Sequence, residues 1–335
     1  MTPLILGLSG ETLTPNERAL FGAADPAGYI LFKRNVVDRQ QLRALTDDLR
    51  SIAGRGDVPI LIDQEGGRVA RMQPPVWPEF PKAERFDALY DVAPISAIEA
   101  ARVNAQAIAA MLVEVGINVN CLPLLDVRQP GAHDIIGDRA LGSEPLRVAA
   151  LGRAVIEGMR AGGVVGVIKH IPGHGRAMAD SHVELPVVDA DADALEIDLA
   201  PFISLRDAPM GMTAHVVYQA WDARDCASLS AKVIGEIIRG RIGFEGLLMS
   251  DDLGMRALSG DFGERAAGVI AAGCDVALHC SGDLAEMEAC VAAVSEIDQQ
   301  AKVRLDRAMA TISGAAGYPI FEKLVAKRDA LLAST

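Results

Sequence analysis

The chain has 335 residues, and half of them are hydrophobic, which is enough to bury a sizeable core. Its net charge of −13 argues against binding to nucleic acid or to an anionic membrane, because neutralising phosphates requires a basic surface. The five cysteines are an odd number and include no CxxC pair, so they indicate neither a disulfide framework nor a zinc knuckle. Free thiols in a reducing compartment are expected instead.

Residues 1–15 contain no basic region, and their apolar run is too short for a signal sequence or a membrane span. We therefore expect a cytoplasmic protein that binds neither membranes nor nucleic acid. Length alone does not distinguish two average domains from one large α/β domain. No linker, low-complexity tract or internal repeat interrupts the sequence, so we expect one domain over residues 1–335. The sequence does not determine the oligomeric state, and a monomer is favoured.

Short apolar runs that are typical of strands recur along the chain, and helical patterns separate most of them. The predicted strands are residues 4–8, 28–32, 58–62, 117–125, 163–168, 211–214, 246–250 and 275–279. The predicted helices are residues 14–21, 38–52, 92–115, 146–161, 229–239 and 260–272, with helical residues from about 284 onward. Thr14, Pro15 and Glu17 supply the first helix with an N-cap, an initial proline and a capping-box glutamate.

Eight strands alternating with helices predict an α/β fold, and eight is the number that closes a (β/α)8 TIM-type barrel. An open doubly wound sheet is the alternative. Polar residues favour the barrel, because they follow the carboxyl ends of different strands, which meet on one face of a barrel. These residues are Asp63, Arg71, Asp126, Arg139, Lys169, His170, His215 and Asp251. No GxGxxG follows the first strand, which removes the usual dinucleotide interpretation.

The segment KHIPGHGRAMADSH, residues 169–182, is the first candidate active site. It follows the run GVVGVI, residues 163–168, which has the pattern of a parallel strand buried on both faces. Lys169 and His170 come where this strand is expected to stop, and two glycines then allow the backbone to turn tightly. Chemistry is therefore expected on the loop after the fifth strand.

Asp251 and Asp252 end the seventh predicted strand. Side chains of adjacent strand residues point to opposite faces, so only one of the two carboxylates can face the mouth of the barrel. We assign Asp252 to capping the next helix and Asp251 to the pocket, where it is the candidate nucleophile.

Asp180 and His182 are two residues apart on the loop after the fifth strand. A carboxylate at this spacing can orient the imidazole and raise its pKa toward the working pH. We therefore interpret His182 as the candidate general acid/base and Asp180 as its partner. A solvated loop histidine is the alternative.

His170 and His174 are four residues apart, which invites a zinc-binding interpretation. A proline and two glycines in this segment argue against the continuous helix that such spacing needs, so we expect neither a metal nor a cofactor. Three cationic side chains could bind hydroxyl or carboxylate groups of a substrate, and the alternative is that they form surface salt bridges. They are Lys169, Arg71 and Arg139.

Several motifs together carry a resemblance to a known family. KHIPGHG followed by DSH, with MSDDLGM, DQEGGRVARM, GYILFKRN and IGDRALG, resembles the family 3 glycoside hydrolases. Within them, the chain is most similar to the single-domain bacterial β-N-acetylhexosaminidases of peptidoglycan recycling. The motifs run from the second strand to the end of the seventh, and KH-x-PGHG-x4-DSH is highly specific.

This resemblance implies a (β/α)8 barrel and a retaining exo-β-N-acetylglucosaminidase. Its expected substrates are cytosolic muropeptide fragments, GlcNAc-1,6-anhydro-MurNAc-peptides, and its mechanism is double displacement through a glycosyl-aspartate. By position, Asp251 matches the nucleophile, His182 the acid/base and Asp180 its partner. The sugar-binding positions of the family match Asp63, Arg71, Arg139, Lys169 and His170. We also expect His215, after the sixth strand, to contact substrate.

The chain departs from the family pattern at Ile171, where an aromatic residue is usual. It also departs at Asp225 and Cys226, where a proline commonly precedes the ASLS segment. Neither departure touches a proposed catalytic atom, so they bear on substrate fit alone.

Three other functions remain open from the sequence. A neutral histidine repels an anionic acceptor less than a carboxylate would, so a β-N-acetylglucosaminide phosphorylase is one alternative. A metal-dependent amidohydrolase barrel is another. A non-catalytic sugar sensor is the third, although the nucleophile and acid/base positions both carry the residues that catalysis needs.

Overall fold

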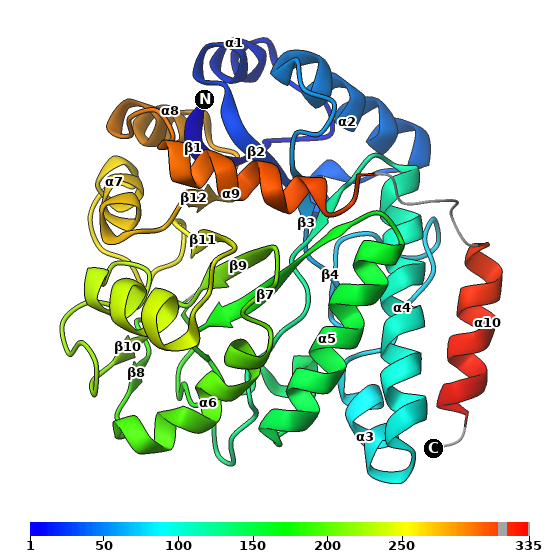
Figure 1. Ribbon diagram of the computed structural model, residues 1–335. Coiled ribbons are helices and arrows are strands. Elements are labelled where there is room, and N and C mark those ends of the chain that lie inside the picture. The colour runs from blue at the N-terminus through cyan, green and yellow to red at the C-terminus, as the bar shows by residue number, and fades with distance from the viewer. Residues whose placement is uncertain (182, 314–319, 334–335) are drawn as a thin grey trace.

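Eight parallel strands close into a barrel in the computed structural model, which describes residues 1–181, 183–313 and 320–333 (Figure 1). The strands follow one another around the barrel in chain order, and β12 (Val276–His279) closes it by pairing with β1 (Thr2–Gly7). The other barrel strands are β2 (Pro26–Leu31), β3 (Ile60–Ile62), β6 (Val119–Asn120), β7 (Val165–Ile171), β9 (Met210–Thr213) and β11 (Leu247–Asp252). The predicted TIM-type barrel is confirmed, and the open sheet is excluded.

Every predicted strand differs from the observed one by at least a residue, and two differences bear on the site. The run 117–125 contains only the short strand β6, because Pro123 has no N–H to donate to a ladder and Leu124 returns for a single bridge with Lys169. The fifth strand continues past residue 168 to Ile171. Lys169 and His170 therefore belong to β7 itself, which fixes their backbone within the barrel wall.

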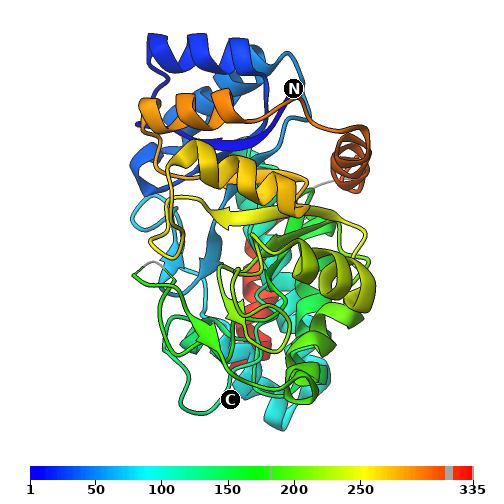
Figure 2. The same ribbon diagram turned by 90° about the vertical axis from the view of Figure 1, so that its left-hand side faces the viewer.

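Helices cover the outside of the barrel (Figure 1). Those of the first half are α1 (Pro15–Ala24), α2 (Arg39–Ala53), α3 (Glu84–Val92), α4 (Pro94–Glu114), α5 (Pro145–Ala161) and α6 (Ala192–Ser204). Those of the second half are the π-helix η3 (Val233–Ile242), α7 (Phe262–Ala272), α8 (Leu284–Ala293), α9 (Gln299–Ala310) and α10 (Phe321–Leu332). Helices α7 and α8 lie side by side in Figure 2.

Two differences concern the predicted helices. The helix expected over residues 92–115 is α4, which begins at Pro94, and the separate helix α3 before it was not predicted; the proline ends α3, because it cannot continue the helix that precedes it. Helix α6 lies where the sequence pattern predicted no helix, and Asp191 caps it by accepting a hydrogen bond from the Ala194 N–H. The capping box of α1 is confirmed, since the Thr14 and Glu17 side chains each accept from the other's backbone N–H.

Short elements outside the barrel order the loops after the strands. An antiparallel hairpin of β4 (Gln64–Gly66) and β5 (Val69–Ala70) follows β3 directly. Strands β8 (Val187–Val188) and β10 (Val217–Tyr218) pair with each other and join the loops after β7 and β9. Two short 3₁₀ turns are η1 (Lys33–Asn35) and η2 (Gly137–Arg139).

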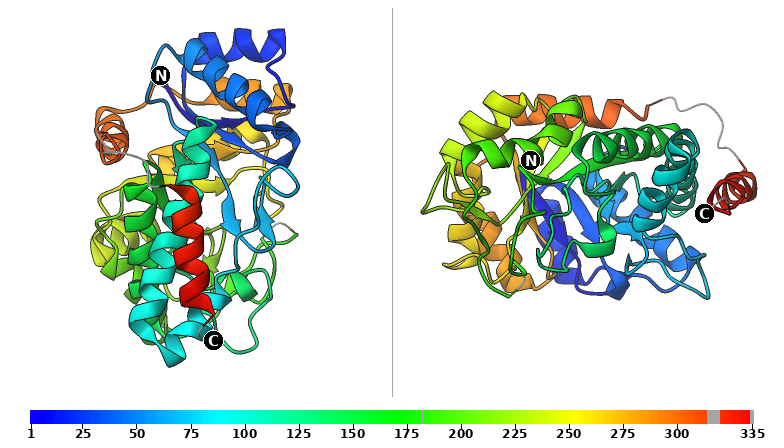
Figure 3. Two further views of the ribbon diagram at one scale, coloured as in Figure 1. Left: turned by 90° about the vertical axis from the view of Figure 1, so that its right-hand side faces the viewer. Right: turned by 90° about the horizontal axis from the view of Figure 1, so that it is seen from below.

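Apolar side chains from all eight strands fill the barrel interior. They include Ile5, Ile30, Leu61, Val119, Val167, Met212, Met249 and Leu278. Leu305, Ala308 and Met309 of α9 join this cluster, so α9 packs against the barrel interior. Figure 3 shows α10 on the outside of α4, where its Leu324 and Leu332 are buried.

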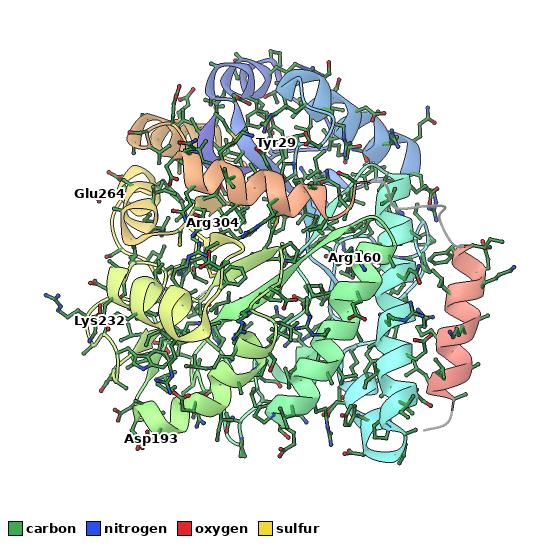
Figure 4. The ribbon with its side chains drawn as sticks, in the orientation of Figure 1. Tyr29, Arg160, Asp193, Lys232, Glu264 and Arg304 are labelled. Atoms are coloured by element: carbon green, nitrogen blue, oxygen red, sulfur yellow. The ribbon has the colours of Figure 1, made fainter. Side chains whose placement is uncertain are left out.

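The outer surface of the helices is charged, as Lys232, Asp193 and Glu264 illustrate by pointing outward, whereas Tyr29 is buried (Figure 4). Among the described residues, no helix combines the length and the hydropathy needed to cross a membrane.

We predict that two helical glycines respond oppositely to replacement by alanine. Gly158 of α5 packs on α4, and a Cβ there would overlap the carbonyl oxygen of Arg102 and the side chain of Ala105. Gly158→Ala should therefore destabilise the protein by about 1–3 kcal/mol through overpacking. Gly22 of α1 is exposed with open space around it, so Gly22→Ala should stabilise by up to about 1 kcal/mol.

Thermal unfolding of the wild type and both variants checks this. A Gly158→Ala protein that unfolds at or above the wild-type temperature would show that α4 and α5 do not pack as closely as described.

Candidate active site

A cavity of about 230 Å³ lies at the carboxyl ends of the barrel strands. Its polar lining includes Asp63, Glu65, Arg71, Arg139, Lys169, His170, His174, Ser181 and Asp251. Its apolar lining includes Ile30, Phe32, Met212 and Leu278. Side chains from around the barrel thus converge at one site, at the end where TIM-type barrels carry their chemistry.

Lys169 is the buried centre of an ion network in this cavity. Its Nζ lies 2.9 Å from Asp63 Oδ1 and 2.7 Å from Glu65 Oε1, and Arg71 Nη2 lies 3.1 Å from Asp63 Oδ2. Burial alone would lower the pKa of Lys169, but the two carboxylates raise it above its ordinary value. Burial also opposes ionisation of Asp63, yet Lys169 and Arg71 hold its pKa well below the usual range. Lys169 and Asp63 are therefore both charged at neutral pH.

Glu65 completes the network by binding Arg139. The Nε and Nη2 atoms of Arg139 each donate to a different oxygen of Glu65 at 2.8 Å, which is a bidentate pair. Burial would raise the pKa of Glu65, but Lys169 and Arg139 lower it to about 2. Sequence reasoning missed Glu65. The available signal was its spacing from Asp63, because alternate residues of an extended chain share a face.

Asn120 of β6 holds the backbone between these two carboxylates. Its Oδ1 accepts from Gln64 N and its Nδ2 donates to Gln64 O, both at 3.0 Å. The side-chain amide thus makes the two hydrogen bonds that a neighbouring strand would otherwise make. Asp63 and Glu65 are fixed on either side of this contact.

Asp126 organises the two histidines of the KHIPGHG motif. Its Oδ2 lies 2.7 Å from His170 Nδ1, and its Oδ1 accepts from the backbone N–H groups of His170 and His174. Burial, followed by the charge of His170, lowers the pKa of His174 to about 4. His174 Nδ1 is buried without a hydrogen-bond partner among the described residues.

The elements that carry His170 and His174 differ from the single helix that the zinc-binding interpretation needs. His170 lies on a strand and His174 on the following loop, so the two do not share a helix face. Within the described part of the chain, no group of three His, Cys, Asp or Glu side chains could hold a metal ion.

Asp251 lies at the end of β11 in phase with Leu247 and Met249, which face the barrel interior. It is 7 % exposed and lines the cavity, as the sequence predicted. Its Oδ1 accepts a hydrogen bond of 2.8 Å from the Asp252 N–H. The prediction that Asp252 caps the next helix is wrong, because Asp261 caps α7. The Asp252 carboxylate instead accepts from the N–H groups of Gly254 and Cys280, and Asp252 also lines the cavity, so the expectation that only one of the two residues faces it is wrong.

The predicted acid/base His182 lies outside the described residues. Its expected partner Asp180 is half-buried, and the Asp180 carbonyl accepts from the N–H groups of Val183 and Glu184. Ser181 lines the cavity, and its carbonyl accepts from the Ala257 N–H in the segment after β11. The loop that carries the DSH motif therefore borders the same cavity as Asp251.

His215 is the one predicted substrate contact that is not among the residues lining the cavity. It is fully buried, and both ring nitrogens bind protein groups. Nδ1 lies 2.6 Å from Ser228 Oγ, and Nε2 lies 3.0 Å from the Asp252 carbonyl oxygen. The geometry gives no support to direct contact between His215 and substrate.

The sequence matches a known family over most of its length. The family described as the glycosyl hydrolase family 3 N terminal domain matches residues 14–313. The chain is a family 3 glycoside hydrolase. Its similarity to the family, inferred above from sequence motifs, is thereby confirmed.

Relatives of this family 3 glycoside hydrolase specify the type of enzyme. A beta-hexosaminidase of Alkalilimnicola ehrlichii is 41% identical over 284 residues, which are 83% of this chain and 80% of the relative. A beta-hexosaminidase of Bordetella avium is 38% identical over 292 residues, 85% and 82% of the two chains. The structure of NagZ from Neisseria gonorrhoeae in complex with N-trifluoroacetyl-D-glucosamine has a TM-score of 0.87 and 29% identity, covering 99% of this chain and 97% of that one. The protein is therefore a glycoside hydrolase of the β-N-acetylhexosaminidase type.

Most of the sequence-predicted binding residues of the glycoside hydrolase gather at the cavity. They are Asp63, Arg71, Arg139, Lys169 and His170, together with the candidate nucleophile Asp251. Sequence reasoning missed the contributions of Glu65 and His174, and it noted Asp126 only as a strand-end residue. Glu65 and Asp126 hold charged or hydrogen-bonding partners in place within the site, and the ring of His174 packs edge-on against that of His170.

We predict that His174 makes stability depend on pH. Its pKa is about 4 in the folded protein against an ordinary value of 6.5, so between these values the unfolded chain binds a proton that the folded chain does not. The contribution of His174 to the free energy of unfolding is therefore lost as the pH falls from 6.5 to 4.

The variant His174→Gln removes this titration. The difference in unfolding temperature between this variant and the wild type should shift in favour of the variant as the pH is lowered from 6.5 to 4. The substitution can also change stability by an amount that does not depend on pH, and this amount does not affect the shift. A difference in unfolding temperature that is the same at every pH would contradict the assigned burial of a neutral imidazole.

Proposed function

We propose that this enzyme is a retaining exo-β-N-acetylglucosaminidase that removes terminal N-acetylglucosamine from muropeptide fragments in the cytoplasm. One observation carries the proposal. The carboxylate of Asp251 shares a small cavity with Lys169 and His170 of the family motif and with Ser181, the residue before His182. A nucleophile, sugar-binding groups and the loop that bears the expected acid/base thus border the same space.

The first chemical step is attack by Asp251 on the anomeric carbon. Because the Asp252 N–H holds Oδ1, the carboxylate is oriented with Oδ2 as the attacking oxygen. His182 protonates the leaving oxygen in this step, and in the second step it takes a proton from the water that cleaves the glycosyl-aspartate. Asp180 stabilises the imidazolium form of His182. Two inversions at the anomeric carbon give net retention.

The ion network supplies the groups that bind the sugar. Asp63 and Lys169 present a carboxylate and an ammonium side by side, and Arg71 and His170 add further polar groups to the lining. Charged donors and acceptors make strong hydrogen bonds to neutral hydroxyl groups. Because the network is held by buried partners, its groups need little reorganisation when a sugar binds.

The size of the cavity supports cleavage at a chain end. Its volume of about 230 Å³ is below the range of ~300–1,000 Å³ that is usual for pockets that hold larger ligands. A cavity of this volume suits one sugar unit better than several consecutive units. We therefore assign the terminal N-acetylglucosamine to the cavity and the remainder of the muropeptide to the solvent side of it.

Two further observations support the choice of substrate. The similar NagZ structure of Neisseria gonorrhoeae holds N-trifluoroacetyl-D-glucosamine, a close analogue of the proposed sugar. The motifs of this chain resemble those of peptidoglycan-recycling enzymes, whose substrates are cytosolic. The net charge of −13 suits a small-molecule substrate better than a polyanion.

We predict that a 5-fluoro N-acetylglucosaminyl donor labels Asp251. Peptide mapping after inactivation should find the covalent sugar on this residue. Asp251→Asn should lower kcat by about 10⁴-fold or more, since an essential nucleophile is lost. The neighbouring Asp252→Asn serves as the matched control, in which the label should still form on Asp251. Label on any other residue would overturn the mechanism.

Analysis of the products distinguishes the hydrolase from the phosphorylase. Incubation of N-acetylglucosaminyl-anhydromuropeptide with and without inorganic phosphate should give free N-acetylglucosamine in both cases. N-acetylglucosamine 1-phosphate as the main product with phosphate would replace the hydrolase with the phosphorylase.

A further inference from the structure

We propose that His215 is a positioning residue for the nucleophile, acting on Asp251 through the backbone of Asp252. This inference rests on the proposed function, because it takes Asp251 as the attacking carboxylate. It assigns to His215 a role in the first chemical step in place of the substrate contact that the sequence suggested.

The peptide unit of Asp252 joins His215 to the nucleophile. On one side, the Asp252 carbonyl oxygen lies 3.0 Å from His215 Nε2. On the other side, the Asp252 N–H donates to Asp251 Oδ1 at 2.8 Å. A displacement of residue 252 would therefore move the hydrogen bond that orients the Asp251 carboxylate.

Regular strand pairing holds this part of β11 on one side only. Toward β9, the register extends only from Leu247 to Met249. Toward β12, the register shifts between Met249 and Asp252 and resumes where Asp252 pairs with Leu278. His215 comes two residues after β9 ends, and its side chain reaches Asp252 where the backbone ladder between the two strands has stopped. The imidazole thus takes the place of a strand partner next to the nucleophile.

Two more side chains fix the ring of His215. A carbonyl oxygen only accepts hydrogen bonds, so Nε2 must carry the hydrogen that binds Asp252. In the neutral ring Nδ1 is then an acceptor, and Ser228 Oγ donates to it across 2.6 Å. Cys226 Sγ lies 3.2 Å from the same hydroxyl and can donate to it in turn. Cys226, Ser228 and His215 are all buried, so this chain of hydrogen bonds is shielded from water.

Cys226 is also where the sequence departs from the family pattern, in which a proline commonly precedes ASLS. Its thiol can donate to the Ser228 hydroxyl that binds His215 Nδ1. The departure that appeared to concern substrate fit therefore lies behind the nucleophile, at the end of this chain of hydrogen bonds.

Glutamine and asparagine at position 215 separate positioning from simple packing. The amide nitrogen of glutamine can reach the position of Nε2 and donate to Asp252, whereas the shorter asparagine reaches only the position of Nδ1. His215→Asn should slow labelling of Asp251 by a 5-fluoro N-acetylglucosaminyl donor by about 100-fold, the scale expected when a reacting group is misplaced by about 1 Å. His215→Gln should recover at least about tenfold of this loss.

An aryl glycoside with a good leaving group gives the second measurement, because its departure needs no acid and its kcat/KM reports nucleophilic attack. The loss should appear in kcat/KM, and the Kd of N-acetylglucosamine should change by less than about threefold, since His215 is not in the cavity lining. Equal rates for the asparagine and glutamine variants, or a loss confined to sugar binding, would overturn the proposal.

His279 provides a matched control, because it is a buried histidine at the end of the neighbouring strand β12 and binds the Glu286 side chain. His279→Asn and His279→Gln should not differ from each other in labelling rate. Should His215→Asn fail to fold, Ser228→Ala retains the ring and removes only its Nδ1 partner, and it should slow labelling by about tenfold. An unchanged labelling rate in Ser228→Ala would count against the proposal.

The outcome for the wild type separates the two proposals. Wild-type protein that is not labelled on Asp251 removes the proposed mechanism. Labelled wild type with unaffected position-215 variants removes only the role of His215.

Discussion

The buried ammonium of Lys169 lies between two carboxylates that arise from the segment after β3, and the rest of the site depends on this arrangement. Removing several charges from water is costly, and their mutual attraction compensates only when every partner is in place. Arg71 and Arg139 satisfy the outer oxygens of Asp63 and Glu65, so no carboxylate in the network depends on Lys169 alone. The barrel strand between β3 and β7 is β6, which is short because it ends at Asn120. Side chains of β7 and of the segment after β3 can therefore meet across it.

Around this network, buried side chains bind the backbone groups of the loops at the points where hydrogen bonding between the parallel strands ends. The amide of Asn120 binds both backbone groups of Gln64, and the carboxylate of Asp126 accepts from the backbone N–H groups of His170 and His174. A loop held only by solvent would leave these polar groups free to reorient. Binding by buried partners instead fixes the loops in one arrangement, which is what a preorganised site requires.

The sequence predicted the barrel because strand periodicity and the rule that polar residues follow strand ends are local signals. Eight apolar runs were visible, and Asp63, Lys169, His170 and Asp251 could be assigned to one face without knowing any contact. What could not be predicted depends on residues far apart in the chain. The bond from Asp126 to His170 spans 44 residues, and no local pattern reports it.

The same limit explains the individual errors. Asp252 resembles a helix cap because a helix follows it, yet its carboxylate accepts from the Cys280 N–H directly after the neighbouring strand β12, 28 residues away. His215 resembles a substrate contact because it follows a strand, yet its ring turns toward Ser228 and Asp252. A residue's position at a strand end indicates which face of the barrel it occupies. Whether its side chain faces the cavity or a neighbouring loop is decided by tertiary packing.

The order of strands around the barrel assigns different tasks to its two sides. Asp63 and Lys169 belong to β3 and β7 and their following segments, with only β6 between them. Asp251 belongs to β11, which is separated from β7 by β9 alone but from β3 by three strands in either direction, so it lies across the barrel from Asp63. In the proposed mechanism, Asp63 therefore binds the sugar from the side of the barrel opposite the nucleophile. Displacement at an anomeric carbon requires this separation, since the groups that fix the ring must not occupy the path of the attacking oxygen.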